Sequence, residues 1–337
     1  MRRIDRTALG GAILGHPAHQ CSAFFQGRAQ RLRDSTFDLC DGALLPAVAR
    51  LIGVEAPAPD APLPSLAPPL PADWPVRDQG RIRGTCVAFS ALAAVELGEV
   101  WQGIAPGARD YSEEHLYALM RGAYAPEDPD SIPGYADGAT ILLQAAASLN
   151  AAPIRNEADL PYVYDTADPA HVQPLRPDPA QDAAGHQPRP PRFVARLFAT
   201  AQDKPLDGFT PALHLLLRHR VPPCIALPLF DENGYSVWTD GVGWDKGMVM
   251  EPEPWGRKTK IAGGHSICLV GYVADRTAPG GGWFRFRNSW GRRFAATAGL
   301  GGTGQAAAEA GYGYLSRRHV EDHCWELMFR SRPADCP

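Results

Sequence analysis

The chain has 337 residues, a length sufficient for one large domain or for two lobes with a sizeable core. Its hydrophobic share of 45% and charged share of 21% are ordinary for a soluble globular protein. The formal net charge of −4 predicts no general affinity for nucleic acid or anionic membranes, and no apolar run reaches the roughly 18–20 residues of a membrane span.

The N-terminus has a basic start followed by a short apolar run over 8–14. Asp5 precedes this run, which is shorter than a signal-peptide core and lacks a clear small-x-small cleavage site. We therefore expect a cytoplasmic location, with secretion by another route left open. The seven cysteines do not settle the compartment, because one nucleophile and three disulfides also need seven.

Residues 1–71 are assigned to an N-terminal extension. A helix is predicted around 43–52, and the proline-rich run 56–71 is expected to be extended and to contribute no core. No standard zinc spacing is formed by the four potential metal ligands of this extension, which are His16, His19, Cys21 and Cys40. We expect neither a metal site nor a cofactor.

The most informative stretch begins at Asp78 and runs Asp-Gln-Gly-Arg-Ile-Arg-Gly-Thr-Cys-Val-Ala-Phe-Ser. Gly80 and Gly84 indicate a loop, and apolar residues then recur at helical spacing over 88–100. Cys86 is therefore expected in the first turn of a helix. Unpaired backbone N–H groups and the positive end of the helix dipole favour a thiolate there.

The remaining elements follow in a simple order. Ser112, with acidic residues after it, predicts a second helix start. Further helices are expected at 141–149 and 210–220, and a proline-rich exposed connector is expected at 165–192. Strands are predicted at 221–230, 247–250, 266–273, 283–288 and, last, 313–316. Helices precede strands, which indicates an α+β fold with two segregated lobes.

Three segments carry a family resemblance. The Cys86 stretch resembles the active-site segment Gln-Gly-x-x-Gly-Ser-Cys-Trp-Ala-Phe-Ser of the papain family (C1 cysteine peptidases). Residues 263–272, Gly-Gly-His-Ser-Ile-Cys-Leu-Val-Gly-Tyr, look like its histidine segment. Residues 284–291, Phe-Arg-Phe-Arg-Asn-Ser-Trp-Gly, look like its asparagine segment. The three occur in the family's order, and the alanine-, arginine- and proline-rich composition fits a bacterial-type member.

The resemblance implies a papain-like two-lobed α+β fold, with a helical left lobe and an antiparallel β-barrel-like right lobe. The active site would lie in the cleft between them. The peptidase domain would span 72–337. Within it we expect the helical lobe at about 84–165, the connector at 165–192 and the β lobe at about 205–330.

The resemblance also implies a Cys-His-Asn triad. Cys86 would attack a carbonyl carbon to form a thioester, and His265 would share and then donate the proton to the leaving amine. Asn288 would fix the imidazole tautomer. Gln79 and the backbone N–H of Cys86 would form the oxyanion hole, and Trp290 would shield the Asn–His hydrogen bond from water.

Four positions depart from the family's pattern. Gln79 lies seven positions before Cys86, one more than usual, so an ordinary loop glutamine stays an alternative. Thr85 replaces serine, and Val87 replaces a tryptophan that packs near the leaving-group side. Arg83 stands where secreted relatives usually carry a cysteine bridged to the helical lobe, which favours a reducing location.

Substrate contacts are predicted by resemblance alone. Gly138 and Ala139 would pair with the substrate backbone, and Gly264 is assigned to substrate binding with them. A plain helix-entry turn is an equal interpretation of 137–140. The expected partner is a protein or peptide substrate. A regulatory protein is a further hypothesis. The extension or an insertion at 292–311 could cover the cleft until a partner or cleavage moves it.

The function expected from these residues is that of a cysteine endopeptidase. Two alternatives stay open. The same triad could serve a transglutaminase- or ligase-like acyl transfer, which needs an amine acceptor that outcompetes water. The chain could also be a catalytically silent binding descendant, and the extra loop residue before Cys86 is the feature that favours this alternative.

Overall fold

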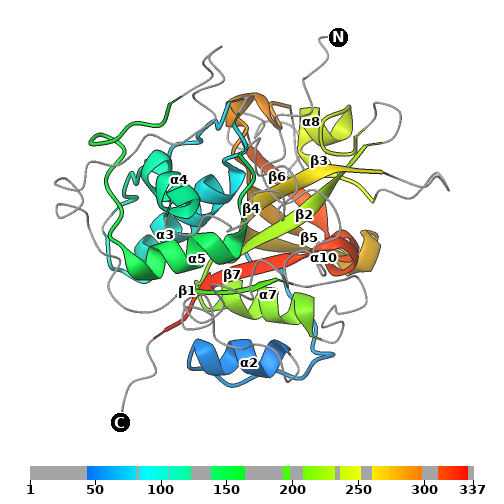
Figure 1. Cartoon of the computed structure of the whole chain (residues 1–337). Coiled ribbons are helices and arrows are strands. Elements are labelled where there is room, and N and C mark those ends of the chain that lie inside the picture. Colours follow the sequence, from blue (N-terminus) through cyan, green and yellow to red (C-terminus); the bar gives the residue numbers. More distant parts are fainter. Residues whose placement is uncertain are drawn as a thin grey trace.

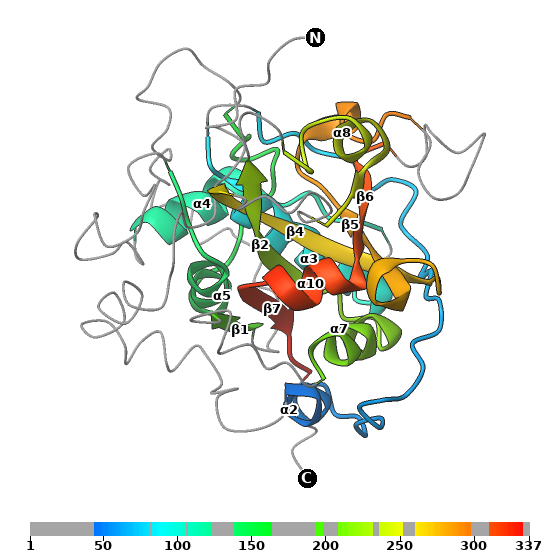
Figure 2. The ribbon, with the colours of Figure 1, turned by 90° about the vertical axis from the view of Figure 1, so that its right-hand side faces the viewer.

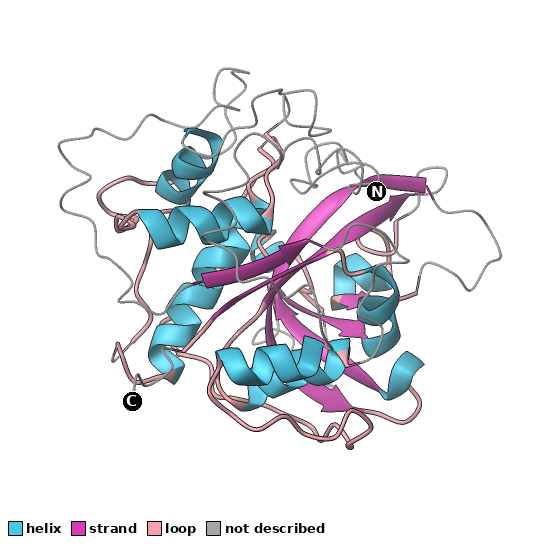
Figure 3. Cartoon of the chain, turned by 60° about the horizontal axis from the view of Figure 1, so that its bottom comes forward, coloured by secondary structure: helices cyan, strands magenta, loops and turns pink. Residues whose placement is uncertain are grey.

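The computed structural model describes residues 44–80, 83–105, 107–122, 138–163, 193–197, 208–231, 236–251, 260–297 and 310–332. The expected connector, the four potential metal ligands of the extension and most of the expected insertion lie outside these residues. The described chain forms a helical lobe and a sheet lobe. In Figure 3 one group of helices lies on the left, the strands cross the centre and right, and further helices lie below and to the right of the strands.

The centre of the helical lobe is α3 (Cys86–Trp101), the helix expected after the glycine-punctuated loop. All but one of its 16 residues are buried, which is typical of a helix enclosed on every side. The expected helices α4 (Glu113–Gly122) and α5 (Leu142–Ala151) flank it. Ser112 caps α4 as predicted, because its Oγ accepts a hydrogen bond from the N–H of His115 at 3.0 Å.

A seven-stranded sheet forms the second lobe, in the order β1-β7-β2-β4-β5-β6-β3 (Figure 1). Neighbouring strands are antiparallel except β3 and β6. The strands are β1 (Phe193–Leu197), β2 (Cys224–Asp231), β3 (Met248–Val249), β4 (Lys260–Ala274), β5 (Gly282–Arg287), β6 (Tyr312–Ser316) and β7 (Glu326–Arg330). Strands β2 to β6 are confirmed, although β4 begins well before residue 266.

Several elements were not expected from the sequence. They are β1, β7, the helices α8 (Val242–Lys246) and α10 (Arg317–His323), and the short 3-10 turns η4 (Pro279–Gly281) and η5 (Gly291–Arg293). The prediction that 313–316 is the last strand was wrong, since β7 follows it. All of β7 is buried, but Glu326 and Arg330 at its ends leave an apolar run of only Leu-Met-Phe, too short to be recognised.

The helix predicted around 43–52 is α2 (Leu44–Leu51), which packs against α7 (Phe209–Arg218). Apolar residues recur along one face of α2 and are buried there, namely Leu44, Leu45, Val48 and Ala49. This part of the extension is therefore integral to the folded domain. No described helix has both the length and the apolar character that a membrane crossing requires.

The extended segment after α2 runs along the side of the molecule in Figure 2. Leu66 and Tyr272 of β4 exchange two backbone hydrogen bonds of 2.7 and 2.9 Å, and the indole of Trp101 donates to the carbonyl of Pro69 at 2.7 Å. A side chain at Gly271 would meet the Leu66 carbonyl oxygen at 2.9 Å, so glycine permits this approach. The expectation that this run carries no core was wrong, because three of its leucines pack on the core: Leu63, Leu66 and Leu70.

Glu326, at the start of β7, is a buried carboxyl group that links the sheet to the helical lobe. It is 1% exposed and accepts a hydrogen bond from the N–H of Leu142, in the first turn of α5, at 2.6 Å. Burial raises the pKa of Glu326 from 4.5 to about 8, against the lowering effect of its backbone hydrogen bonds. The folded state therefore binds the proton more tightly than the unfolded chain. Stability contributed by Glu326 falls as pH rises from about 4.5 to about 8.

Glu326→Gln should abolish this pH dependence, because the amide does not titrate and its oxygen still accepts from Leu142. We expect the free energy of unfolding of the wild type to fall relative to the variant between pH 5 and pH 8. The fall should approach about 1.4 kcal/mol for each pH unit. Urea unfolding followed by tryptophan fluorescence measures it, with the exposed Glu55→Gln as control. A difference that stays constant over this range would contradict the prediction.

Candidate active site

Cys86 is the first residue of α3 and follows the N-cap residue Thr85, so its predicted place in the first helical turn is confirmed. N–H groups of a first turn have no partner within the helix, and the positive end of the helix dipole lies there. Both features favour a thiolate over a thiol at this position. The side chain is 0% exposed.

His265 lies in β4, and Asn288 directly follows β5, the strand paired with β4. The sheet brings the two side chains together, with Nε2 of His265 2.7 Å from Oδ1 of Asn288. Because an amide oxygen only accepts hydrogen bonds, Nε2 carries the proton of the neutral ring and Nδ1 is the available base. This Nδ1 is buried and has no hydrogen-bond partner among the described residues.

Burial lowers the pKa of His265 from 6.5 to about 4, and the hydrogen bond with Asn288 acts in the opposite direction. Desolvation disfavours the imidazolium, whereas a neighbouring negative charge favours it. A thiolate at Cys86 would supply that charge. The histidine is therefore neutral unless the thiol ionises with it.

Two contacts set the start of α3 against the sheet. Ser90, one helical turn after Cys86, places its Oγ 2.6 Å from the Oγ of Ser266, the residue after His265. The backbone N–H of Gln79 donates to the carbonyl of Ser289 at 2.7 Å. The three segments that carry the predicted triad thus converge at one place, between the helical lobe and the sheet.

A second backbone contact extends this junction. Asp78 and Trp290 form an isolated antiparallel bridge, and the N–H of Gly291 donates to the carbonyl of Arg77 at 3.0 Å. Gly291 has φ +67°, and a side chain there would meet Oδ2 of Asp78 at 2.6 Å. Glycine is therefore required for the two segments to approach this closely.

Gln79, the predicted oxyanion donor, is 1% exposed and held at both ends of its amide. Its Oε1 accepts from the hydroxyl of Ser289 at 2.6 Å, and its Nε2 donates to the carbonyl of Arg83 at 3.3 Å. The side chain of Gln79 is thus held against the loop that leads to Cys86, although one residue more than usual separates Gln79 from Cys86. Residues 81–82, where a bulge was expected, lie outside the described residues.

Aromatic rings enclose the imidazole of His265. Trp290 stacks on it with ring centroids 4.4 Å apart and an interplanar angle of 30°, and Trp238 meets it edge-on at 5.5 Å. Trp244 stacks on Trp290 in turn at 6.1 Å. The shielding role of Trp290 stays a prediction, and no motif singled out Trp238, which meets the ring edge, or Trp244, which backs Trp290. The only sequence feature that could have indicated Trp238 and Trp244 is that both tryptophans lie in an otherwise polar, glycine-rich segment.

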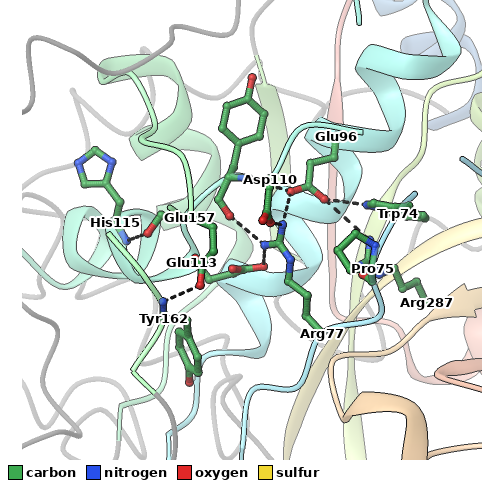
Figure 4. Close-up of polar contacts among 12 residues, drawn as sticks. Trp74, Pro75, Arg77, Glu96, Asp110, Glu113, His115, Glu157, Tyr162 and Arg287 are labelled. Atoms are coloured by element: carbon green, nitrogen blue, oxygen red, sulfur yellow. Dashed lines mark hydrogen bonds and ion pairs between the residues drawn. The ribbon is translucent and has the colours of Figure 1, made fainter. Parts of the chain in front are cut away.

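A cluster of charged side chains fastens the chain just before Gln79 (Figure 4). The guanidinium of Arg77 donates to Glu96 at 2.8 Å and also to Glu113 and Asp110. Glu96 and Glu113 are 1% and 2% exposed, from α3 and α4 respectively. Burial raises the pKa of Glu113 to about 8, and the neighbouring Arg77 opposes this effect. The cluster ties residue 77 to both helices.

The residues predicted to bind substrate are found in two places. The carbonyl of Gly138 accepts from the hydroxyl of Tyr117 at 3.0 Å, and that of Ala139 accepts from Arg121 at 3.4 Å, so both carbonyls are bound to α4. Gly264 is buried in β4 beside the histidine. Their assignment to substrate binding stays a prediction.

The site combines groups suited to acyl transfer. A thiol at a helix start, a histidine oriented by an amide and a fixed glutamine amide are the parts that nucleophilic catalysis through a thioester needs. Within the described ranges no group of three or more His, Cys, Asp or Glu side chains could hold a metal ion.

A helical lobe packed against a mixed, mostly antiparallel sheet, with a cysteine at a helix start and a histidine on a strand of the sheet, is the papain-like fold, the α+β class expected from the sequence. Xylellain, a cysteine protease from Xylella fastidiosa, shares this fold at 17% identity over 81% of this chain and 88% of that one, with a TM-score of 0.53. ProCathepsin B S9 from Trypanosoma congolense does so at 14% identity over 81% and 79%, also with a TM-score of 0.53. No family model and no curated protein matches the sequence.

An ionic coupling between Cys86 and His265 would appear in the pKa of His265. In Cys86→Ala we expect the pKa of His265 to stay near the low value of about 4 that burial imposes. In the wild type we expect a higher pKa, because the thiolate stabilises the imidazolium. Adding Asn288→Ala to Cys86→Ala should lower the pKa further, since the Asn288 hydrogen bond raises it.

NMR titration of histidine-labelled protein, with the His265 signal assigned from His265→Gln, provides these pKa values. Equal pKa values in wild type and Cys86→Ala would show that the two side chains do not form an ion pair.

Proposed function

We propose that the chain is a papain-like cysteine peptidase that hydrolyses peptide bonds in protein or peptide substrates through Cys86, His265 and Asn288. The observation that carries this proposal is the 2.7 Å contact between His265 Nε2 and Asn288 Oδ1, which leaves Nδ1 as the base. The start of α3 provides the nucleophile, and the fold is one that cysteine proteases use.

In the proposed reaction the sulfur of Cys86 attacks the substrate carbonyl carbon, and a C–S bond forms as the carbonyl electrons move to oxygen. The Nε2 of Gln79 and the N–H of Cys86 donate to this oxyanion. The imidazolium of His265 protonates the leaving nitrogen as the C–N bond breaks, which leaves a thioester. The neutral imidazole then takes a proton from water, whose oxygen attacks the thioester. The acid product leaves, and the thiolate–imidazolium pair is restored.

Regulation is proposed at the step of substrate access. Cys86 and His265 are both 0% exposed, so a substrate reaches them only after part of the chain moves. The described part of the extension contacts Trp101, at the end of α3 that lies about 22 Å from Cys86. We therefore assign any inhibition by the extension to residues 1–43. The segment 292–311, which follows Trp290, is the other candidate.

An epoxide-type thiol inhibitor of papain-like enzymes should add once to the wild type, as measured by intact mass. The adduct should disappear in Cys86→Ala and form at least about tenfold more slowly in His265→Ala, because the imidazole no longer supports the thiolate. Cys224→Ala is the matched control, since Cys224 is equally buried and burial raises the pKa of its thiol. This variant should label like the wild type.

The same labelling tests regulation and the alternatives. Faster labelling of a chain that begins at residue 44 would support inhibition by residues 1–43, and equal rates would contradict it. The absence of an adduct on Cys86 in both chains would sink the peptidase proposal and favour a binding-only protein. An adduct with no peptide hydrolysis, but with acyl transfer to an added amine, would favour the transglutaminase- or ligase-like alternative.

Gln79→Ala should lower kcat for peptide hydrolysis by about 10²- to 10³-fold, because one of two donors to the oxyanion is lost. Alkylation of Cys86 by iodoacetamide forms no oxyanion, so its rate should stay near that of the wild type. Ser289→Ala is the control, because it removes the anchor of the Gln79 amide but keeps its donor, and a smaller fall is expected. An unchanged kcat in Gln79→Ala would identify an ordinary loop glutamine.

A further inference from the structure

Arg83, three residues before Cys86, is a buried cation paired with a buried anion. Its side chain is 2% exposed, and that of Glu114, in α4, is 0% exposed. Nη2 of Arg83 donates to Oε1 of Glu114 at 2.9 Å while Nη1 donates to Oε2, so the pair is bidentate. Nη1 also donates to the carbonyl of Val163 at 3.2 Å. Such a fork fixes direction as well as distance.

Two tyrosines complete the surroundings of this ion pair. The guanidinium carbon of Arg83 lies 5.1 Å from the ring centroids of both Tyr117 and Tyr162, in reach of cation–π attraction. The hydroxyl of Tyr162 donates to the carbonyl of Gln79 at 2.9 Å and lies 2.7 Å from Oγ1 of Thr85. The side chain that packs on Arg83 therefore also holds the start and the end of the loop that leads to Cys86.

The backbone of Arg83 holds the candidate oxyanion donor as well. Its carbonyl accepts the hydrogen bond from Nε2 of Gln79 at 3.3 Å. A shift of Arg83 away from α4 would therefore move both Gln79 and, through the three following residues, Cys86. A misplacement of about 1 Å in a catalytic group can cost about 10²-fold in rate.

We propose that the Arg83–Glu114 ion pair is the positioning element of the candidate site, setting the place of Cys86 and Gln79 relative to His265. Its effect on turnover rests on the proposed peptidase function. Lysine cannot reproduce the bidentate fork. Breaking a buried pair also leaves an uncompensated charge and destabilises the fold, so the test has to separate position from stability and from charge.

Arg83→Met and Glu114→Gln change the local charge in opposite directions. A positioning role predicts the same outcome for both: kcat for peptide hydrolysis falls by about tenfold or more, KM stays within about twofold, and alkylation of Cys86 by iodoacetamide at pH 6 slows. A field effect predicts opposite shifts of the pH profile of alkylation, because one variant removes a positive charge and the other a negative one. Opposite shifts would overturn the proposal.

A double variant separates position from stability. Arg83→Met with Glu114→Met removes both charges, so its Tm should return towards that of the wild type while kcat stays low. Arg83→Lys keeps the charge, and its kcat should lie between those of the wild type and Arg83→Met. Leu213→Ala opens a cavity in α7, lowers stability, and should leave kcat unchanged below its Tm. A normal kcat in the double variant would contradict the positioning role.

Failure of the peptidase proposal is distinguishable from failure of this inference. A wild type that is alkylated at Cys86 but hydrolyses no peptide contradicts the peptidase, and the alkylation profiles of the Arg83 and Glu114 variants still decide on positioning. Normal turnover and alkylation in all of these variants contradict the positioning role alone.

Discussion

The docking of residues 77–79 against 289–291 is the contact on which the candidate site depends. Two main-chain hydrogen bonds make it, of 2.7 Å from Gln79 to Ser289 and 3.0 Å from Gly291 to Arg77. Backbone groups must be paired when they are buried, so this junction satisfies a general requirement while it joins the loop before α3 to the chain after β5. The place of Gln79 relative to Asn288 follows from it.

Buried ion pairs hold the chain on both sides of Gln79 from the side of the helical lobe. Arg77 is paired with Glu96 and Glu113, and Arg83 with Glu114, so an arginine anchors the chain on each side of Gln79. Desolvation makes each isolated charge costly, and only a specific bidentate geometry offsets that cost. Apolar packing tolerates alternative arrangements more readily. The charged residues thus hold Arg77 and Arg83 against the helices, at a place where the proposed acyl transfer would be sensitive to small displacements.

Local patterns in the sequence predicted the elements with strong local signals. α3 and α4 have helical periodicity and, for α4, a serine cap, and β2 to β6 contain recognisable apolar runs. β1 and β7 were missed because their apolar runs are short and their burial comes from pairing with neighbouring strands and from packing against α5. The segment 56–71 was expected to carry no core because prolines suggest exposure. Leu66 is instead partnered by Tyr272, a contact between distant parts of the sequence that no local pattern reveals.

The sequence by itself determined the order of the three chemistry-bearing segments and the placement of Cys86 at the start of a helix, because turns, caps and periodicity act over a few neighbouring residues. The tertiary structure places His265 2.7 Å from Asn288, a contact that the family resemblance had implied. It alone decided that Trp238 closes the edge of the imidazole and that Arg83 pairs with Glu114. These contacts depend on strand register and on how the helices pack against the sheet. A shift of one residue in the register of β4 would turn the histidine to the opposite face, and the register observed is the one in which β4 pairs with β2 and β5.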